Sequence, residues 1–148
     1  MLTGKKIVLG VSGGIAAYKM ANVASMLSKL HADIHVVMTE NATHFITPET
    51  FEVLTGNHCY TDTFDRCMEL HVPHIALGTQ ADAILIAPAS ADVVGKIANG
   101  IADDMLTTCV LPATCPVMLA PSMNVHMYEN PIVQDNMKKL ASYGYEII

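Results

Sequence analysis

The sequence predicts a single-domain α/β fold: a doubly wound, Rossmann- or flavodoxin-like parallel sheet with helices on both faces. Five short apolar runs alternate with segments of helical periodicity along the 148 residues. The runs are rich in Ile, Val and Leu and poor in charge, as strands buried on both faces require. The length suits one domain, so residues 1–148 are expected to form one unit.

The first two strands are expected at residues 5–11 and 33–39, separated by a glycine turn and a helix. After the turn, apolar residues recur at helical spacing, namely Ala16, Met20, Val23, Ala24, Leu27 and Leu30. A strand, helix and strand within about thirty residues fit a right-handed parallel crossover. A shorter helix is expected to follow the second strand.

Residues 47–56 predict the next helix, with Thr47 as N-cap, Pro48 at the first helical position and Gly56 as the stop. The remaining strands are expected at residues 81–90, 116–122 and 145–148. One or two helices fill residues 91–111 with a break near Gly100, and a last helix ends at Gly144. Residues 57–73 show no clear pattern.

The composition indicates which kinds of binding partner and which cellular compartment to expect. The chain has 8 basic and 14 acidic residues, a formal charge of −6, and no basic cluster to grip nucleic acid. No apolar stretch reaches the length of a membrane span, and the expected location is the cytoplasm. The four cysteines, Cys59, Cys67, Cys109 and Cys115, are interpreted as thiols and small core residues. A hydrophobic content of 51% favours a homo-oligomer.

Residues 10–19, GVSGGIAAYK, place small residues between the first strand and its helix. Backbone N–H groups at such a turn attract an anion such as phosphate, but glycines also let a strand and a helix pack closely. Both explanations stay open. The spacing is not GxGxxG, and Met38-Thr39 stands where an NAD site has an acidic residue, which argues against a dinucleotide and favours FMN.

Three segments, taken in order and at their spacing, resemble one family. They are GVSGGIAAYK, residues 73–108 beginning PHIALGTQADAILIAPASADVV, and residues 120–131, APSMNVHMYENP. They resemble the homo-oligomeric flavin-containing cysteine decarboxylases, and within them the phosphopantothenoylcysteine decarboxylases of coenzyme A biosynthesis. The most specific part is the pattern P-x-M-N-x-x-M followed by an aromatic, combined with a His eight residues before Asp82.

The resemblance implies FMN, a homotrimer or multiple of trimers, and a cofactor between subunits at the strand ends. The implied cofactor-binding residues are Gly13, Gly14, Ile15, Thr39, Glu40, Asn41, Ser90, Ala91 and Ser122. It also implies decarboxylation of 4'-phospho-N-pantothenoylcysteine to 4'-phosphopantetheine. Oxidation of the thiol gives a C=S group, which accepts the electrons that CO2 leaves behind.

His74 is the implied proton-transfer residue, since imidazole titrates near neutrality. Its rival is His71, and Cys67 with the two histidines could suggest zinc. No well-spaced fourth ligand appears, and no metal is expected.

Asn124 is the implied catalytic and substrate-binding residue, together with Met127. Its amide can donate to the substrate carboxylate without the tight grip of an arginine, which would stabilise a charge that must leave as neutral CO2. Met123 and Met127 would form an apolar wall that favours loss of the carboxylate. The alternative is that the methionines are core residues and Asn124 only caps the turn.

Some positions depart from the family pattern. Ser90 and Ala91 are followed by Asp92-Val93 in place of Asn-Thr, Ser122 replaces Ala, and the closing aromatic is Tyr128. Family members continue into a flap with an A-C-G motif, and this C-terminal flap is expected to be missing here. A peptidyl-cysteine decarboxylase needs no such cysteine and is the main alternative. A flavin-binding regulatory subunit without catalysis and an α/β domain without flavin are the others, and a flavin prenyltransferase is disfavoured.

Overall fold

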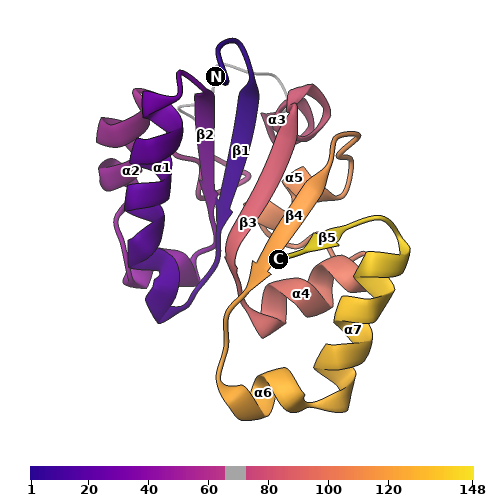
Figure 1. Ribbon diagram of the computed structural model, residues 1–148. Helices are drawn as coiled ribbons and strands as arrows, with labels where there is room; N and C mark the ends of the chain where they lie inside the picture. The colour runs from indigo at the N-terminus through magenta and orange to yellow at the C-terminus, as the bar shows by residue number, and fades with distance from the viewer. Residues whose placement is uncertain (66–72) are drawn as a thin grey trace.

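The computed structural model describes residues 1–65 and 73–148 and contains one five-stranded sheet (Figure 1). The strands are β1 (Lys6–Val11), β2 (Asp33–Met38), β3 (Ala83–Ala89), β4 (Val117–Pro121) and β5 (Glu146–Ile147). All neighbouring strands run parallel, in the order β2-β1-β3-β4-β5. This flavodoxin-like order confirms the predicted fold class. It also places the point where the winding reverses between β1 and β3, where ligands bind in such folds.

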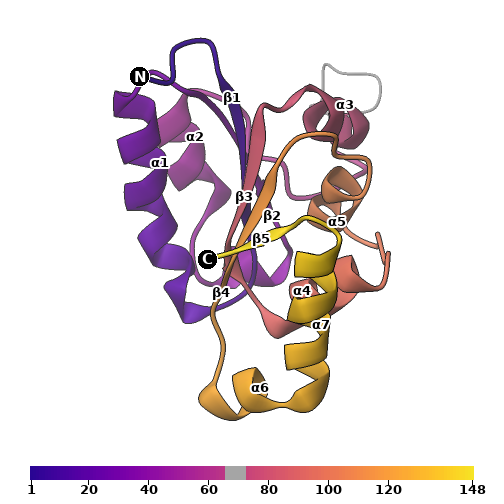
Figure 2. The ribbon, with the colours of Figure 1, turned by 45° about the vertical axis from the view of Figure 1, so that its right-hand side comes forward.

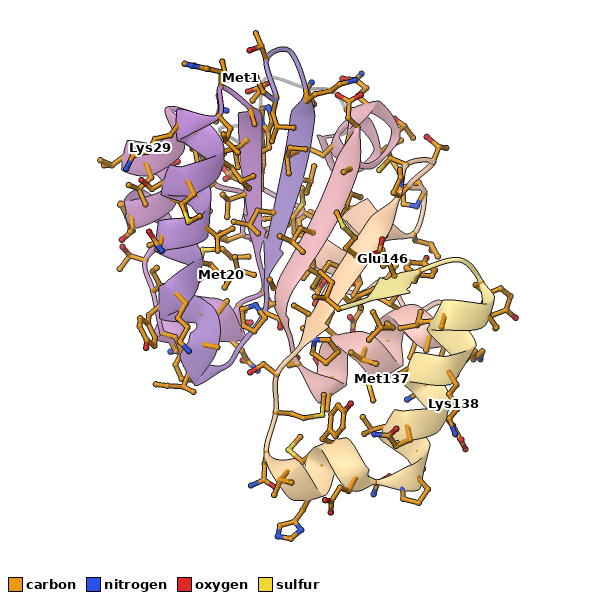
Figure 3. All side chains as sticks on the ribbon, viewed as in Figure 1. Met1, Met20, Lys29, Met137, Lys138 and Glu146 are labelled. Carbon is orange, nitrogen blue, oxygen red and sulfur yellow. The ribbon has the colours of Figure 1, made fainter. Side chains whose placement is uncertain are left out.

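Helices cover both faces of the sheet. They are η1 (Ile15–Lys19), α1 (Met20–Lys29), η2 (Asn41–His44), α2 (Pro48–Thr55), α3 (Pro73–Gln80), α4 (Ala91–Ala98), α5 (Met105–Val110), α6 (Val125–Glu129) and α7 (Pro131–Ser142). Figures 1 and 2 show α1 and α2 on one face, and α3, α4, α5 and α7 on the other. The small helix α6 extends beyond the ends of the strands. Figure 3 shows α7 turning Met137 toward the sheet and Lys138 away from it.

The strands are apolar throughout because each face contributes to a separate core. Along β1, Val8 belongs to the cluster under α4, α5 and α7, whereas Leu9 and Val11 belong to the cluster under α1 and α2. All three side chains are 0% exposed. Burial of a Val or Leu side chain contributes roughly 1.5–3 kcal/mol, so the two-sided burial of β1 is a large stabilising term. Cys59 and Cys109 are also buried, as expected.

The helix ends agree with the sequence signals. Helix α2 begins after Thr47 and stops at Gly56, whose φ of 73° lies in the left-handed region that favours glycine. The Thr47 hydroxyl does not bond a backbone N–H; it lies 2.9 Å from the Thr50 hydroxyl instead. Two helices fill residues 91–111, and Gly100 lies in the break between them.

The structure adds two features that the sequence pattern left undefined. Residues 58–60 run beside the outer edge of β2, where Tyr60 accepts a hydrogen bond from the Met38 N–H at 2.8 Å. This contact covers an edge that would otherwise expose unpaired backbone groups. Helix α6 forms between Pro121 and Pro131.

No helix in the described part of the chain has both the length and the apolar character to cross a bilayer.

Candidate functional site

The carboxyl ends of β2, β1, β3 and β4 form one edge of the sheet, where backbone hydrogen bonds continue past the strands. The Thr39 N–H donates to the Val11 carbonyl at 3.0 Å, and the Ser122 N–H donates to the Ala89 carbonyl at 3.0 Å. The three segments that carried the family resemblance contribute to this edge, although they are far apart in the sequence. The edge therefore brings together the glycine turn, the start of α4 and the chain leading to α6.

A cavity of about 450 Å³ opens at this edge. It is lined by Gly13, Thr39, Glu40, Asn41, Ser90, Ala91, Asp92, Val93, Lys96, Asp103, Asp104 and Met127. The structure thus brings seven of the predicted site residues around one space: Gly13, Thr39, Glu40, Asn41, Ser90, Ala91 and Met127. A second cavity of about 420 Å³ adjoins it and shares Glu40, Asp103 and Asp104.

The two glycines of the turn have different roles. A Cβ on Gly13 would lie 2.5 Å from the Asn41 Cβ and 3.2 Å from the Asn41 carbonyl carbon, so only glycine fits there. Gly14 is extended, with a φ of −176°, and the nearest described atom to an added Cβ is the Pro88 Cγ at 4.0 Å. Close packing therefore explains Gly13, whereas no described contact explains Gly14.

The first turn of α4 forms another wall of the cavity. Ser90 is its N-cap, and the Ser90 hydroxyl accepts a hydrogen bond from the Val93 N–H at 3.3 Å. The buried Ser12 hydroxyl in turn accepts a hydrogen bond from the Ser90 N–H at 2.9 Å. Ser12 was not predicted as a site residue, because a serine before two glycines is a common turn residue.

An ion cluster also lines the cavity. The Lys96 ammonium lies 3.1 Å from Asp103, 3.3 Å from Asp92 and 3.8 Å from Asp104. Burial alone would lower the pKa of Lys96, but hydrogen bonds to Asp103 and Asp92 and the nearby charges outweigh it and raise the pKa above its usual value. Asp104 also caps α5, accepting from the Thr107 N–H at 2.7 Å.

Sequence reasoning missed this cluster as part of the site, although two signals for it were present. Asp92 and Lys96 are spaced i,i+4 on one helix, and Asp104 stands three residues before a threonine at a helix start. Those signals predict local helix structure. They do not predict that the helix and the loop approach the same cavity.

Asn124 is the N-cap of α6, and its Oδ1 accepts a hydrogen bond from the His126 N–H at 2.9 Å. Its amide N–H2 donates to no residue in the described part of the chain, so this group is left as a donor. Met127, on the first turn of α6, lines the cavity while Asn124 lies just outside the lining. Capping and ligand contact are therefore compatible roles for Asn124.

Three of the other predicted residues are not among those that line the cavity. Gly14 and Ile15 follow Gly13 directly, and Ile15 is 76% exposed. Ser122 bonds to Ala89 through its backbone N–H, but it does not line the cavity.

His74 lies elsewhere in the fold. It belongs to the first turn of α3, which ends at Gln80, just before the start of β3. There the Asp82 N–H donates to the Lys6 carbonyl, at the amino ends of the strands. Figures 1 and 2 both show α3 at this end of the sheet, opposite the end where β4 leads to α6. Helix α3 therefore lies at the opposite end of the sheet from α6.

His71 and Cys67 lie outside the described residues. Within residues 1–65 and 73–148, no group of three or more His, Cys, Asp or Glu side chains has an arrangement that could hold a metal ion.

The Flavoprotein family matches residues 1–148, the whole length of the chain. The chain belongs to this family. It is 49% identical over 145 residues to the coenzyme A biosynthesis bifunctional protein CoaBC of Bacillus subtilis (strain 168), covering 98% of this chain and 36% of that protein. The chain thus spans about a third of the length of such bifunctional relatives. It is 44% identical over 146 residues to a Streptococcus mutans protein named "Probable phosphopantothenoylcysteine decarboxylase", covering 97% of this chain and 82% of that one.

Solved structures of flavoprotein decarboxylases share the fold over nearly the full chain. The FMN-dependent cysteine decarboxylase SpaF superposes with a TM-score of 0.93 at 37% identity, covering 100% of this chain and 85% of that one. A cysteine-to-serine variant of a PPC decarboxylase complexed with pantothenoylaminoethenethiol superposes with a TM-score of 0.84 at 30% identity, covering 97% and 81%. This Flavoprotein chain is therefore similar to decarboxylases in both sequence and fold.

Proposed function

We propose that the chain is an FMN-dependent carboxy-lyase that converts 4'-phospho-N-pantothenoylcysteine to 4'-phosphopantetheine in coenzyme A biosynthesis. The observation that carries this proposal is the cavity at the carboxyl ends of the strands, which is lined by seven of the site residues that the resemblance to the decarboxylases implies. The sequence relatives named for coenzyme A biosynthesis and for phosphopantothenoylcysteine decarboxylation support the substrate.

The cavity fits a flavin mononucleotide. Its volume of about 450 Å³ lies in the range of cofactor sites, roughly 300–1,000 Å³. Within the described structure a side chain on Gly14 would meet no steric clash, so packing does not explain the glycine. Because glycine has no side chain, a ligand can approach the Gly14 backbone closely. The residues that would hold FMN are Gly13, Gly14, Ile15, Thr39, Glu40, Asn41, Ser90, Ala91 and Ser122. Bound there, FMN supplies a two-electron acceptor for oxidation of the substrate thiol.

The substrate carboxylate is the group that Asn124 would orient. The Asn124 Oδ1 accepts from the His126 N–H, and the amide N–H2 is the group that can donate to a carboxylate. A neutral donor holds a carboxylate more weakly than a cation does, and the charge is lost when CO2 leaves. Met127 adds an apolar wall on the same side of the cavity and excludes water from the carboxylate.

His74 would reach this cavity from a neighbouring copy of the chain. Its helix lies at the opposite edge of the sheet from the cavity of its own chain. Ile15 and Tyr18, beside the glycine turn, are 76% and 58% exposed, which is the apolar surface that a neighbour would cover. A cytoplasmic homotrimer that seats α3 of one copy over the cavity of the next would bring an imidazole to the substrate for proton transfer.

A peptidyl-cysteine decarboxylase is the second candidate. SpaF, at a TM-score of 0.93, is described only as an FMN-dependent cysteine decarboxylase, so the fold and cofactor do not separate a small substrate from a peptide. The two candidates share the thiol oxidation and the loss of CO2. They differ in what is attached to the cysteine nitrogen.

The test is a visible spectrum of the purified protein, followed by anaerobic addition of either 4'-phospho-N-pantothenoylcysteine or a peptide ending in cysteine. The expected result is a flavin band and release of CO2 with the first substrate only. Release with the peptide alone would favour the second candidate. A flavin-bound protein that releases CO2 from neither would be a binding subunit, and a protein that takes up no FMN would refute the proposal.

A further inference from the structure

The regular pairing between β1 and β3 ends before either strand reaches its last residue. Their last paired residues are Gly10 and Ile86, and the pairing of β3 with β4 shifts between Ile86 and Ala89. The cavity lies directly beyond this point. Something other than the regular ladder must therefore hold the glycine turn and the start of α4 at a fixed separation.

Ser12 supplies that connection through its side chain. Its hydroxyl donates to the Pro88 carbonyl at 2.5 Å and accepts from the Ser90 N–H at 2.9 Å, and its own N–H donates to the same carbonyl at 3.3 Å. The three groups form a relay from Ser90 through Ser12 to Pro88. Ser12 is 0% exposed, so no water can replace the hydroxyl without rearrangement.

The groups on either side of this relay are cavity walls. Gly13 follows Ser12 and lies against Asn41, while Ser90 and Ala91 begin α4. The Ser90 hydroxyl accepts the capping bond from the Val93 N–H, and the group of Ser90 that bonds to Ser12 is its backbone N–H. A buried N–H without a partner is costly, and loss of the Ser12 hydroxyl would let the start of α4 move to find one.

We propose that Ser12 is a positioning residue for the flavin: its hydroxyl fixes the distance between the glycine turn and the first turn of α4, the two walls between which FMN binds. This inference rests on flavin binding in the proposed function and is independent of which cysteine substrate is decarboxylated. Ser12 itself is fully buried and need not touch the cofactor.

The experiment compares Ser12→Ala with Ser28→Ala. The control serine also donates its hydroxyl to a backbone carbonyl, that of Leu54 at 3.2 Å, but it joins α1 to α2 away from the cavity. Each variant is stripped of flavin and titrated with FMN, and its flavin spectrum, midpoint potential and apoprotein unfolding are measured. Ser12→Thr, which keeps the hydroxyl, serves as the rescue variant.

The expected result is an FMN Kd about tenfold or more higher for Ser12→Ala, with a shifted flavin spectrum or potential, and a wild-type Kd for Ser28→Ala. Ser12→Thr should recover most of the affinity. The inference is overturned if folded Ser12→Ala binds FMN like the wild type, or if Ser12→Thr binds no better than Ser12→Ala. It is also overturned if both alanine variants lose affinity equally. A wild-type protein that binds no FMN would instead refute the proposed function.

Discussion

The Lys96 ammonium and the Asp103 carboxylate lie 3.1 Å apart, and this ion pair joins α4 to the loop that leads into α5. Both residues line the cavity of about 450 Å³ at the carboxyl ends of the strands, and Asp103 also lines the second one. The pair therefore stands at the boundary between the two cavities. It holds a short loop in place where no strand supports it.

Replacement of Lys96 by Met should weaken FMN binding by about tenfold, because three carboxylates would face the cavity without their cation and would repel the cofactor phosphate. Lys96→Arg should retain most of the affinity. Fluorescence titration with FMN measures both variants. Equal affinity of Lys96→Met and the wild type would remove this cluster from the cofactor site.

The pH dependence of the same variant can be predicted. The raised pKa of Lys96 means that its ion pairs stabilise the fold in full below the ordinary lysine pKa of 10.5. This stability is lost as the pH rises through the higher folded-state pKa. Thermal unfolding of the wild type and Lys96→Met between about pH 7 and 11 should show a constant difference that shrinks only at the alkaline end. If the stability difference between the wild type and Lys96→Met disappeared near neutral pH, the raised pKa of Lys96 would be contradicted.

Gly13 and Gly14 should respond differently to alanine. Gly13→Ala forces a Cβ against Asn41 and should cost about 1–3 kcal/mol of unfolding free energy, even without cofactor. Gly14→Ala has room within the chain and an extended backbone, so the apoprotein should unfold like the wild type while FMN affinity falls. Denaturant unfolding and FMN titration separate these effects. Similar behaviour of both variants in both assays would argue against the division of roles.

Asn124→Asp should keep the fold and the flavin but lose decarboxylation. Aspartate caps helices as well as asparagine does, so the bond to the His126 N–H can remain. The variant lacks the amide donor and repels the substrate carboxylate. Single-turnover CO2 release measures the loss.

Asn130→Asp is the matched control for Asn124→Asp. Asn130 caps α7 with the same geometry, accepting from the Ile132 N–H at 2.9 Å, and it does not line the cavity. This variant should decarboxylate normally. Unchanged turnover in Asn124→Asp, or an equal loss in both variants, would leave Asn124 with a capping role only.

Two cysteines should resist alkylation. Burial raises the pKa of Cys59 and of Cys109 to about 12, with Glu52 and Glu49 adding to the effect at Cys59. At pH 8 only about one thiol in ten thousand would be the reactive thiolate. Mass spectrometry after brief iodoacetamide treatment should find both unmodified in the native protein and modified after unfolding. Rapid native labelling of either would show that its cluster opens readily.

The fold and much of the cavity followed from local signals in the sequence. Apolar runs flanked by turn residues located all five strands, and Gly56 marked a helix end because few other residues accept a positive φ. Resemblance added the roles of residues such as Asn41 and Ser90, which the structure places around one cavity. These features depend on residues close together in the chain or on motifs of fixed spacing.

Contacts between distant segments were decided only by the tertiary structure. The Ser12 relay joins residues 76 and 78 positions apart, and Lys96 meets Asp103 only because α4 ends in a turn that brings the chain back. The tertiary structure also places α3 near the amino ends of the strands, at the opposite end of the sheet from α6. Sequence periodicity specifies which face of an element is buried, but the packing of crossover helices on the sheet decides which polar groups meet.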